Sequence, residues 1–514
     1  MSIAIKGVIA PLASDSSVAT SESSTFKGRV WIGDDGRVAA VTRGTKAGPK
    51  ELQGTRVVDV GSCLVLPGLI DLHSHLAYAT LPLWEEPDRT VPFAHHDIWP
   101  SRPTYAKAVT WPAYAFVVAS PAELLAYAEV RAVIGGTTSI QGSPPRNRPL
   151  DGWLVRNVED ERFSGGVGED QILASTLPMK SDQLARRANQ MRAGATFIYH
   201  CAEGQPGSIV AREYTAVGQA GCLQGRLIAI HTNALGPDAY GAWTTPGTIV
   251  WSPFSNLWLY GTTTDIPAAR ARRIRVCLGS DWGPSGTRNV LGELKVAQLV
   301  SEARGWSLST LELLKMVTAN PGDALAAAWG VQAGRLQPGA LGDVVVISAP
   351  AGKSWVDGVM AATEAAVELV VIGGRPVYGT TERMQAAGAT GTSSLVVNGV
   401  RRSLALSRFD EPGKRWPFDE VLARMTEVAG DPKGEIEGAR LRASAALREG
   451  KPPPLRLALD MPTGRAPIGG LPKDLNEIEV PPLAPLAHDP AFFASLIGHG
   501  FHGGLLDGLA GFYA

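Results

Sequence analysis

Between residues 67 and about 330 the chain alternates apolar runs of strand length with longer stretches of helical periodicity. This order of elements is typical of a parallel α/β architecture, in which a helix follows each strand. The helical stretches include SPAELLAYAEVRAVIGG, whose Ser-Pro start suits a helix N-terminus, and STLELLKMVTANPGDALAAAW. The strand candidates are LPGLIDLHSH, GTTSIQG, QILASTLPM, ATFIYHCAE, RLIAIHTNA, TIVWSPFSN and RIRVCLGSD. With one further strand left unplaced, they nearly make the eight units of a (β/α)₈ barrel of the TIM type.

The segments that flank this region are richer in short strands and turns. Within residues 1–66, GRVWIGDDGRVAAV contains the Asp-Asp-Gly signal of a tight hairpin, and RVVDVGSCLVLPG continues the pattern. The same pattern of short strands separated by turns recurs within 331–380, in GRLQPGALGDVVVIS and VELVVIGGRPVYG. We predict one small β-sandwich built from both flanks of a barrel at 67–330. Residues 381–514 follow as a C-terminal extension of unknown role, with an amphipathic helix in FDEVLARMTEVAG.

Composition and charge exclude several classes of protein. Of the 514 residues, 45% are hydrophobic and 19% charged, which is typical of a soluble globular protein. Lys and Arg total 48 against 49 Asp and Glu, so neither nucleic acid nor a membrane surface is an expected partner. We find no apolar run of about 18 residues and no clear secretory signal. Four scattered cysteines without a CxxC pair suit reduced thiols in the cytoplasm.

Several of the predicted strands end in side chains that bind metals or transfer protons. These are His73 and His75 after the first run, His200 and Glu203 after ATFIYH, His231 after RLIAIH, and Asp281 after RVCLGSD. A lone His or Asp after a strand is usually a cap or a turn residue. The carboxyl ends of barrel strands, however, face one mouth where catalytic groups gather. Because such residues follow four strands in order, we expect them to share one site.

As an ordered set, several motifs resemble the amidohydrolase superfamily, in particular its mononuclear aminohydrolases and chlorohydrolases (cytosine, guanine and triazine deaminase-like enzymes). They are LPGLIDLHSH, HCAEG, IHTNAL, SPFSNLWLYG, LGSDWGPSG, TANPGDAL and GRLQPGALGDVVVI, between about residues 60 and 380. The resemblance implies one divalent metal ion, Zn²⁺ foremost with Fe²⁺ or Mn²⁺ as alternatives. The implied metal ligands are His73, His75, His200 and Asp281. Glu203 becomes the proton shuttle, and His231 lies beside the reacting atom of the substrate.

The resemblance implies hydrolysis of a non-peptide C–N bond of a small-molecule substrate by metal-bound hydroxide. Either a nitrogen heterocycle is deaminated or a cyclic amide or amidine is opened. Asp281 would accept the proton of the water, Glu203 would protonate the leaving group, and His231 would polarise the electrophile. Hydrolytic dehalogenation of an aromatic ring uses the same groups and stays open. A catalytically inactive binding or scaffold protein is the alternative from another class, although such a barrel would normally lack ligands that this chain has. A homodimer is a further expectation from the family.

Two side chains near the predicted site are left out of the ligand set. Two-metal relatives bridge their ions with a carboxylated lysine, for which Lys180 is the nearby candidate. A solvent-facing lysine is the plainer interpretation. Cys201 follows His200 directly, and alternation along a strand points neighbouring side chains to opposite faces. We therefore predict a single metal ion without a thiolate ligand.

The stretch LPLWEEPDRTVPFAHHDIWPSRPTYAKAVTWP, directly after the first two histidines, departs from the better-known deaminases. Its tryptophans either form a lid over a planar substrate or pack the loop against the barrel. His95 and His96 are not a credible metal pair, because neighbours on an extended chain point apart. Arg288 would bind a carboxylate, either of the substrate or internal. The tentative substrate-binding residues are Trp84, Trp99, Asn256, Trp258, Trp282 and Arg288.

Overall fold

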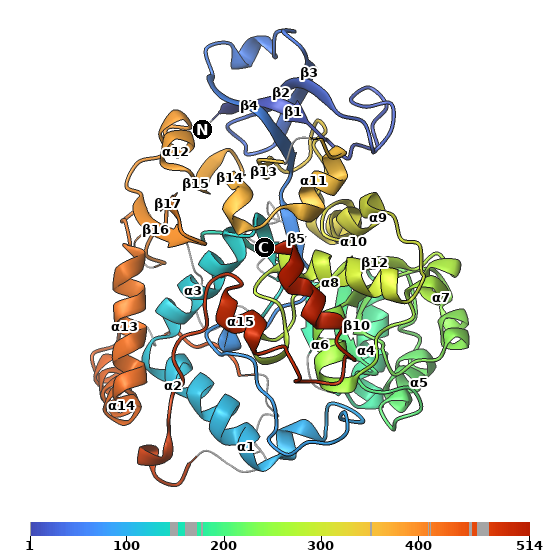
Figure 1. Ribbon diagram of the computed structural model, residues 1–514, viewed down its shortest axis with the longest axis vertical. Helices are drawn as coiled ribbons and strands as arrows, with labels where there is room; N and C mark the ends of the chain where they lie inside the picture. Colours follow the sequence, from blue (N-terminus) through green and yellow to red (C-terminus); the bar gives the residue numbers. More distant parts are fainter. Residues whose placement is uncertain are drawn as a thin grey trace.

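The central part of the chain carries short parallel strands in two sheets (Figure 1). The computed structural model describes residues 2–143, 153–159, 172–175, 178–349, 352–409, 411, 413–451, 455–459 and 472–514. One sheet contains β5 (Leu69–Asp71), β6 (Thr137–Ile140) and β7 (Arg156–Asn157). The other contains β8 (Ile172–Ser175), β9 (Thr196–Cys201), β10 (Leu227–His231), β11 (Thr248–Trp251) and β12 (Arg275–Leu278).

Each of the seven apolar runs picked from the sequence contains one of these strands. Strands β9, β10 and β11 are buried along their whole length, as strands covered on both faces must be. The two sheets approach each other at β5 and β12. There the Leu72 N–H donates to the Leu278 carbonyl at 3.4 Å, and Ser74 forms a parallel bridge with Asp281. This contact brings the first and last strand ends to one place.

Helices connect the strands and cover them. They include α2 (Trp111–Ala119), α3 (Pro121–Val133), α4 (Ser181–Arg192), α5 (Ala211–Gln219), α6 (Pro253–Tyr260), α7 (Ile266–Ala271) and α8 (Val290–Ala303). Over the described residues, no single helix has the length and apolarity to cross a membrane. One pair, Ala106–Ala119 with Pro121–Val133, meets that test only when joined across a 112° bend.

The helix predicted from STLELLKMVTANPGDALAAAW is two helices, α9 (Thr310–Lys315) and α10 (Ala319–Trp329). The chain breaks at Thr318, where φ is −134° and ψ is −93°. Pro321 explains the break, because proline has no N–H and is tolerated in the first turn of a helix but not in its interior. The new start therefore places Pro321 where its missing donor is harmless.

Strands from both flanks join in one nine-stranded sheet, in the order β16-β17-β15-β14-β13-β4-β1-β2-β3. The strands of the first flank are β1 (Ile3–Ile9), β2 (Phe26–Ile32), β3 (Val38–Arg43) and β4 (Arg56–Pro67). Those of the second are β13 (Val344–Ile347), β14 (Val367–Ile372), β15 (Arg375–Gly379), β16 (Ser393–Val397) and β17 (Val400–Leu404). The flanks meet where β13 pairs antiparallel with β4.

This sheet differs from the expected sandwich in two ways. Its strands form a single hydrogen-bonded series, and it continues past residue 380, where the second flank was predicted to end. The continuation comes from a hairpin of β16 and β17, whose turn residues Asn398 and Gly399 both have positive φ. An Asn-Gly turn of this kind matches the twist of the strands it joins. Strand β17 then pairs with β15 and extends the sheet.

A buried ion pair connects the flanking sheet with the central strands. Arg156 of β7 donates from Nε to one Asp343 oxygen at 2.7 Å and from a terminal nitrogen to the other at 3.0 Å. The two side chains are only 13% and 8% exposed. Such a bidentate pair fixes the relative orientation of the two groups.

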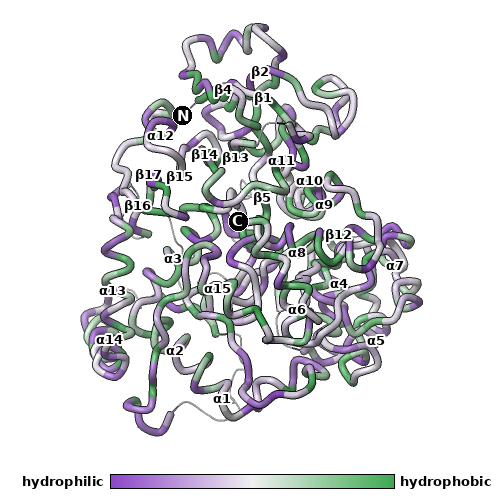
Figure 2. The backbone as a smooth tube through the Cα atoms, in the orientation of Figure 1, coloured by the Kyte–Doolittle hydropathy of each residue, from purple (hydrophilic) through white to green (hydrophobic). Residues whose placement is uncertain are grey.

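The C-terminal extension includes α13 (Phe418–Gly430), which has the bounds of the predicted amphipathic helix, and α14 (Pro432–Arg448). Figure 2 shows purple, hydrophilic stretches at α14 and green stretches at the central strands β5 and β12. The end of the chain contains α15 (Pro490–Ala494) and the 3₁₀ segment η10 (Leu505–Phe512), which packs on α8 (Figure 1). The apolar C-terminal end is thus docked on the central domain.

Candidate active site

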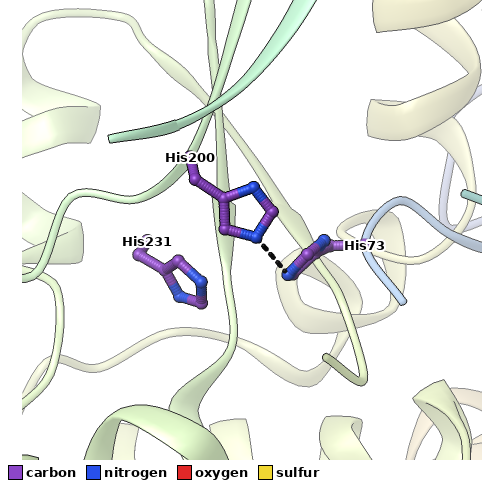
Figure 3. A group of neighbouring side chains, drawn as sticks. All are labelled: His73, His200 and His231. Carbon is purple, nitrogen blue, oxygen red and sulfur yellow. Dashed lines mark hydrogen bonds between the residues drawn. The ribbon is translucent and has the colours of Figure 1, made fainter. Parts of the chain in front are cut away.

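Three imidazole rings face one another at the ends of β5, β9 and β10 (Figure 3). His200 Nε2 lies 3.2 Å from His73 Nε2, and the His231 ring centroid is 5.3 Å from each of the other two centroids. One ring nitrogen from each of the three lies within 4.8 Å of the other two. The three histidines are buried, so an ion held among them would have few water ligands.

Asp281 adds a carboxylate to the same place. Its Oδ1 lies 2.9 Å from His73 Nε2 and 3.3 Å from His75 Nε2. His73, His75 and Asp281 thus form a second set with ligand atoms within 4.8 Å of one another, and His73 belongs to both sets. The four residues that the sequence pointed to as ligands therefore come together, although 208 positions separate His73 from Asp281.

The protonation of this cluster suits a divalent cation. Burial, with the neighbouring histidines, holds the pKa of His200 well below its ordinary value, so its ring is neutral and offers a lone pair. Burial alone would raise the pKa of Asp281, but His73 and His231 hold it well below its usual range. Imidazole nitrogens and one carboxylate are ligands that zinc and its neighbours in the first transition series accept.

Two side chains behind the cluster orient it. The His73 Nδ1 lies 3.1 Å from the Gln141 amide oxygen, so Nδ1 donates and Nε2 keeps its lone pair toward the cluster. Asp71 accepts the backbone N–H groups of Ser280 at 3.0 Å and His73 at 3.3 Å, which ties β5 to the end of β12. Neither was singled out from the sequence. The signal for Asp71 was visible, as the one charged residue within the apolar run LIDL.

Glu203 lies beside this cluster in a network of its own. Its Oε1 accepts the Tyr260 hydroxyl at 2.6 Å, and its Oε2 lies 3.7 Å from His231 Nε2 and 3.8 Å from His96 Nδ1. Burial opposes a charge on His96, but Asp97 and Glu213 beside it raise its pKa to about 10. His96 is therefore a cation beside the buried Glu203 carboxyl.

The backbone around the site adopts a conformation that is rare outside glycine. Ala202, His231, Thr232 and Asp281 have φ values of 54°, 67°, 60° and 61°. Left-handed conformations of this kind are unfavourable for residues with a Cβ, most of all for β-branched threonine. They occur here at the points where β9, β10 and the β12 run give way to loops, and they turn the functional side chains toward the cluster.

Two tryptophans of the long loop, Trp84 and Trp99, pack on Trp282. Trp99 stacks on Trp282 with ring centroids 5.1 Å apart and an interplanar angle of 28°, and Trp84 stands edge-on to Trp282 at 6.4 Å. Trp84 and Trp282 are buried, and Trp99 is partly exposed. This arrangement corresponds to the second of the two interpretations offered for the loop, in which its aromatic residues pack against the barrel. Trp99 keeps an accessible face.

Three other residues predicted to bind substrate, Asn256, Trp258 and Arg288, contact protein groups in the structure. Asn256 is fully buried and its amide lies 3.4 Å from His231 Nδ1, so it supports that histidine. The Trp258 indole donates to the Trp84 carbonyl at 2.8 Å. The Arg288 guanidinium lies 4.9 Å from the Phe492 ring, in the contact with the C-terminal segment. These side-chain contacts depend on packing between segments that are distant in the sequence, which the sequence alone does not show. Lys180 is exposed at the start of α4, as a loop lysine would be.

Comparison with known proteins yields relatives of one kind. No family model matches the chain. The 5-methylthioadenosine/S-adenosylhomocysteine deaminase of Syntrophobacter fumaroxidans is 26% identical over 361 residues, covering 61% of this chain and 78% of that protein. The enzyme of the same name from Pyrococcus furiosus is 24% identical over 351 residues, covering 61% and 81%.

In sequence, the chain is similar to these deaminases. It also shares its fold with solved structures of low sequence identity. An adenosine deaminase from Xanthomonas campestris with bound zinc has a TM-score of 0.56 at 15% identity, covering 85% of this chain and 98% of that one. The guanine deaminase of E. coli has a TM-score of 0.55 at 18% identity, covering 74% and 100%. A triazine hydrolase variant has a TM-score of 0.57 at 15% identity, covering 83% and 99%.

Proposed function

We propose that this chain is an amidohydrolase that hydrolyses a non-peptide C–N bond, by deaminating a nitrogen heterocycle or opening a cyclic amide or amidine. One observation carries the proposal. His231 Nε2 lies 3.7 Å from Glu203 Oε2 and 3.9 Å from Asp281 Oδ2. A carboxyl, an imidazole and a carboxylate of the ligand cluster thus lie next to one another, which is the arrangement that proton transfer to a leaving amine requires. The deaminases among the relatives support the same reaction class.

In this proposal His73, His75, His200 and Asp281 hold one divalent cation, Zn²⁺ foremost, with Fe²⁺ and Mn²⁺ as alternatives. When bound, the cation supplies the Lewis acidity that brings the pKa of water down toward about 7. Asp281 accepts at Oδ2 the proton that the attacking water loses, because Oδ2 faces His231. The Glu203 carboxyl carries a proton on Oε2 to the ring nitrogen or leaving amine.

His231 acts in this proposal as a hydrogen-bond donor. The Asn256 amide nitrogen faces its Nδ1 at 3.4 Å, and the Thr264 hydroxyl lies 3.4 Å from the Asn256 amide oxygen. An amide N–H directed at Nδ1 makes that atom the acceptor, so Nε2 carries the proton. Burial lowers the pKa of His231, which keeps the ring neutral. The Nε2–H group then stabilises negative charge that develops on the substrate.

The proposal extends to the fold of the enzyme, its cellular location and its oligomeric state. The parallel strands would close into a (β/α)₈ barrel over 67–330. The contact of β5 with the end of β12 supports closure. We further propose a small-molecule substrate, a cytoplasmic location and a homodimer.

The experiment is a screen of the zinc-loaded protein for ammonia release. Suitable compounds are 5-methylthioadenosine, S-adenosylhomocysteine, adenosine, guanine, and a set of cyclic amides assayed by ring opening. Atrazine, assayed by chloride release, tests dehalogenation. We expect near one equivalent of metal per chain and turnover of at least one amine or amide. Turnover of atrazine alone would replace the proposal with dehalogenation, and no metal after supplementation would refute it.

The variant Glu203→Gln tests the proton shuttle. The amide keeps the shape of the side chain but cannot transfer a proton, so kcat should fall by roughly 10²–10⁴-fold while the metal content stays the same. Glu302→Gln is the matched control, because Glu302 is an exposed carboxylate of α8. Equal kcat values for the two variants would remove Glu203 from this role.

A further inference from the structure

Residues 81–102, here called the lid segment, dock directly on the chain that follows Glu203. The His96 N–H donates to the Glu203 carbonyl at 3.2 Å, the Gln205 N–H donates to the Ala94 carbonyl at 2.7 Å, and His95 pairs with Gly204. A Cβ at position 204 would come within 2.6 Å of the Ala94 carbonyl oxygen. Glycine at this position therefore permits the close approach of the two backbones.

The lid segment is also fixed to α6, the helix that carries Tyr260. Arg89 donates to the Leu259 carbonyl at 3.2 Å and the Trp258 carbonyl at 3.3 Å, and the Phe93 N–H donates to Leu259 as well, at 3.0 Å. These carbonyls belong to the last turn of α6, where a helix lacks internal donors and favours a cation. The lid segment thus supplies the C-terminal partners of this helix.

A chain of side-chain hydrogen bonds runs from the lid segment to the catalytic carboxyl. The Trp99 indole donates to the Tyr260 hydroxyl at 2.9 Å, and that hydroxyl donates to Glu203 Oε1 at 2.6 Å. Tyr260 is 1% exposed, and burial together with Glu203 raises its pKa well above the ordinary value. The phenol therefore stays protonated and its single O–H is directed at Glu203.

The two oxygens of Glu203 consequently have different surroundings. Oε1 is bound to the Tyr260 hydroxyl at ordinary hydrogen-bond length. Oε2 has His231 at 3.7 Å and His96 at 3.8 Å, both beyond that length, and it borders the space next to the ligand cluster. A proton on Oε2 has access to a substrate there, whereas Oε1 is already occupied by a donor.

We propose that Tyr260 is a positioning residue that anchors Glu203 through Oε1 and leaves Oε2 as the oxygen that delivers the proton, and that Trp99 of the lid segment acts on Glu203 through Tyr260. The inference rests on the proposed function, since it assigns the proton shuttle to Glu203. It adds that the lid segment completes the catalytic geometry. Hydrogen bonds in such a chain polarise one another and strengthen the terminal bond.

The kinetic test uses the zinc-loaded enzyme and whichever compound of the ammonia-release screen it turns over. Tyr260→Phe should lower kcat by about 10- to 100-fold, with KM changed less than about 3-fold, because one hydrogen bond to a charged group is lost. Tyr214→Phe is the matched control: it deletes a buried hydroxyl that donates to the Ala239 carbonyl at 2.9 Å.

A double-mutant cycle tests the part assigned to Trp99. Trp99→Phe keeps an aromatic ring but removes the donor to Tyr260, and we expect a smaller loss of kcat, about 3- to 10-fold. In the Tyr260→Phe background the same change should have no further effect on kcat, because its route to Glu203 is already interrupted. Multiplicative losses in the double variant would refute the coupling, and an unchanged kcat in Tyr260→Phe would refute the positioning role.

A crystal structure of metal-loaded Tyr260→Phe separates this inference from the proposed function. We expect the Glu203 carboxyl to rotate or to occupy more than one orientation, and to stay fixed in Tyr214→Phe. If the wild type turns over none of the compounds, the proposed function fails, but the position of Glu203 in the variant still decides on the anchor. A Glu203 carboxyl that keeps its place without the Tyr260 hydroxyl would overturn the inference.

Discussion

Replacing Asp343 by asparagine should destabilise the fold far more than its distance from the active site suggests. Asp343 accepts two hydrogen bonds from Arg156, at 2.7 Å and 3.0 Å, and a third from the Gly373 N–H at 2.9 Å. The variant Asp343→Asn keeps the volume but removes the negative charge. The Arg156 guanidinium, 13% exposed, then loses the negative charge of the carboxylate that it contacts through two nitrogens.

The expected magnitude follows from that burial. Removing one partner of a buried ion pair lowers the free energy of unfolding by about 3–5 kcal/mol, because the other charge stays desolvated. The matched control is Asp59→Asn, which breaks the pair with Lys6 at 2.6 Å, where the side chains are 55% and 45% exposed. An exposed pair contributes at most about 1 kcal/mol, although its contact is as short as the buried one.

Urea unfolding followed by tryptophan fluorescence measures both variants. The zinc concentration must be the same throughout, because a bound ligand adds to the apparent stability. We expect the unfolding midpoint of Asp343→Asn to fall well below that of the wild type and the midpoint of Asp59→Asn to stay close to it. Equal shifts for the two variants would show that burial does not set the contribution of these pairs.

Two further changes test contacts around the site. Because its acidic neighbours raise the pKa of His96 to about 10, the stabilisation from its charge is complete below its ordinary pKa of 6.5 and is lost as the pH rises toward 10. His96→Gln should therefore lower the free energy of unfolding by about 1–3 kcal/mol near pH 6 and change it little near pH 10, as measured by urea unfolding. An equal effect at both pH values would contradict the assignment. Phe492→Ala removes a buried ring that packs on His488 and Phe254. The loss should destabilise the docked C-terminal end by about 3–5 kcal/mol and speed its proteolysis. Ile497→Ala, at a side chain 67% exposed, is the control and should leave the cleavage rate unchanged.

The clustering of His73, His75, His200 and Asp281 could be predicted because its signal is local. A histidine or aspartate at the end of an apolar run, as in ATFIYH or RVCLGSD, marks both the strand and the edge at which it ends. The strand that escaped prediction, β7, is only two residues long, Arg156 and Asn157. A run of this length has no periodicity, and only its pairing with β6 defines it as a strand.

The surroundings of the cluster could not be predicted, because they depend on contacts between distant segments. Tyr260 reaches Glu203 across 57 positions, and nothing in the run NLWLY sets that tyrosine apart from its aromatic neighbours. The Arg288 guanidinium lies 4.9 Å from the ring of Phe492, which belongs to a C-terminal extension whose role the sequence did not indicate. The hairpin that extends the flanking sheet past residue 380 was likewise invisible until its partner strand was known.

The left-handed residues at the strand ends bear on how this protein can evolve or be engineered. Glycine at Ala202 or Thr232 would relieve torsional strain of roughly 1–2 kcal/mol per residue. The same change would loosen the loops that hold His231 and Glu203 in place, since glycine accepts many other conformations. Selection for heat resistance alone would therefore favour substitutions that selection for turnover removes. These positions are where thermostability and catalysis compete in this chain.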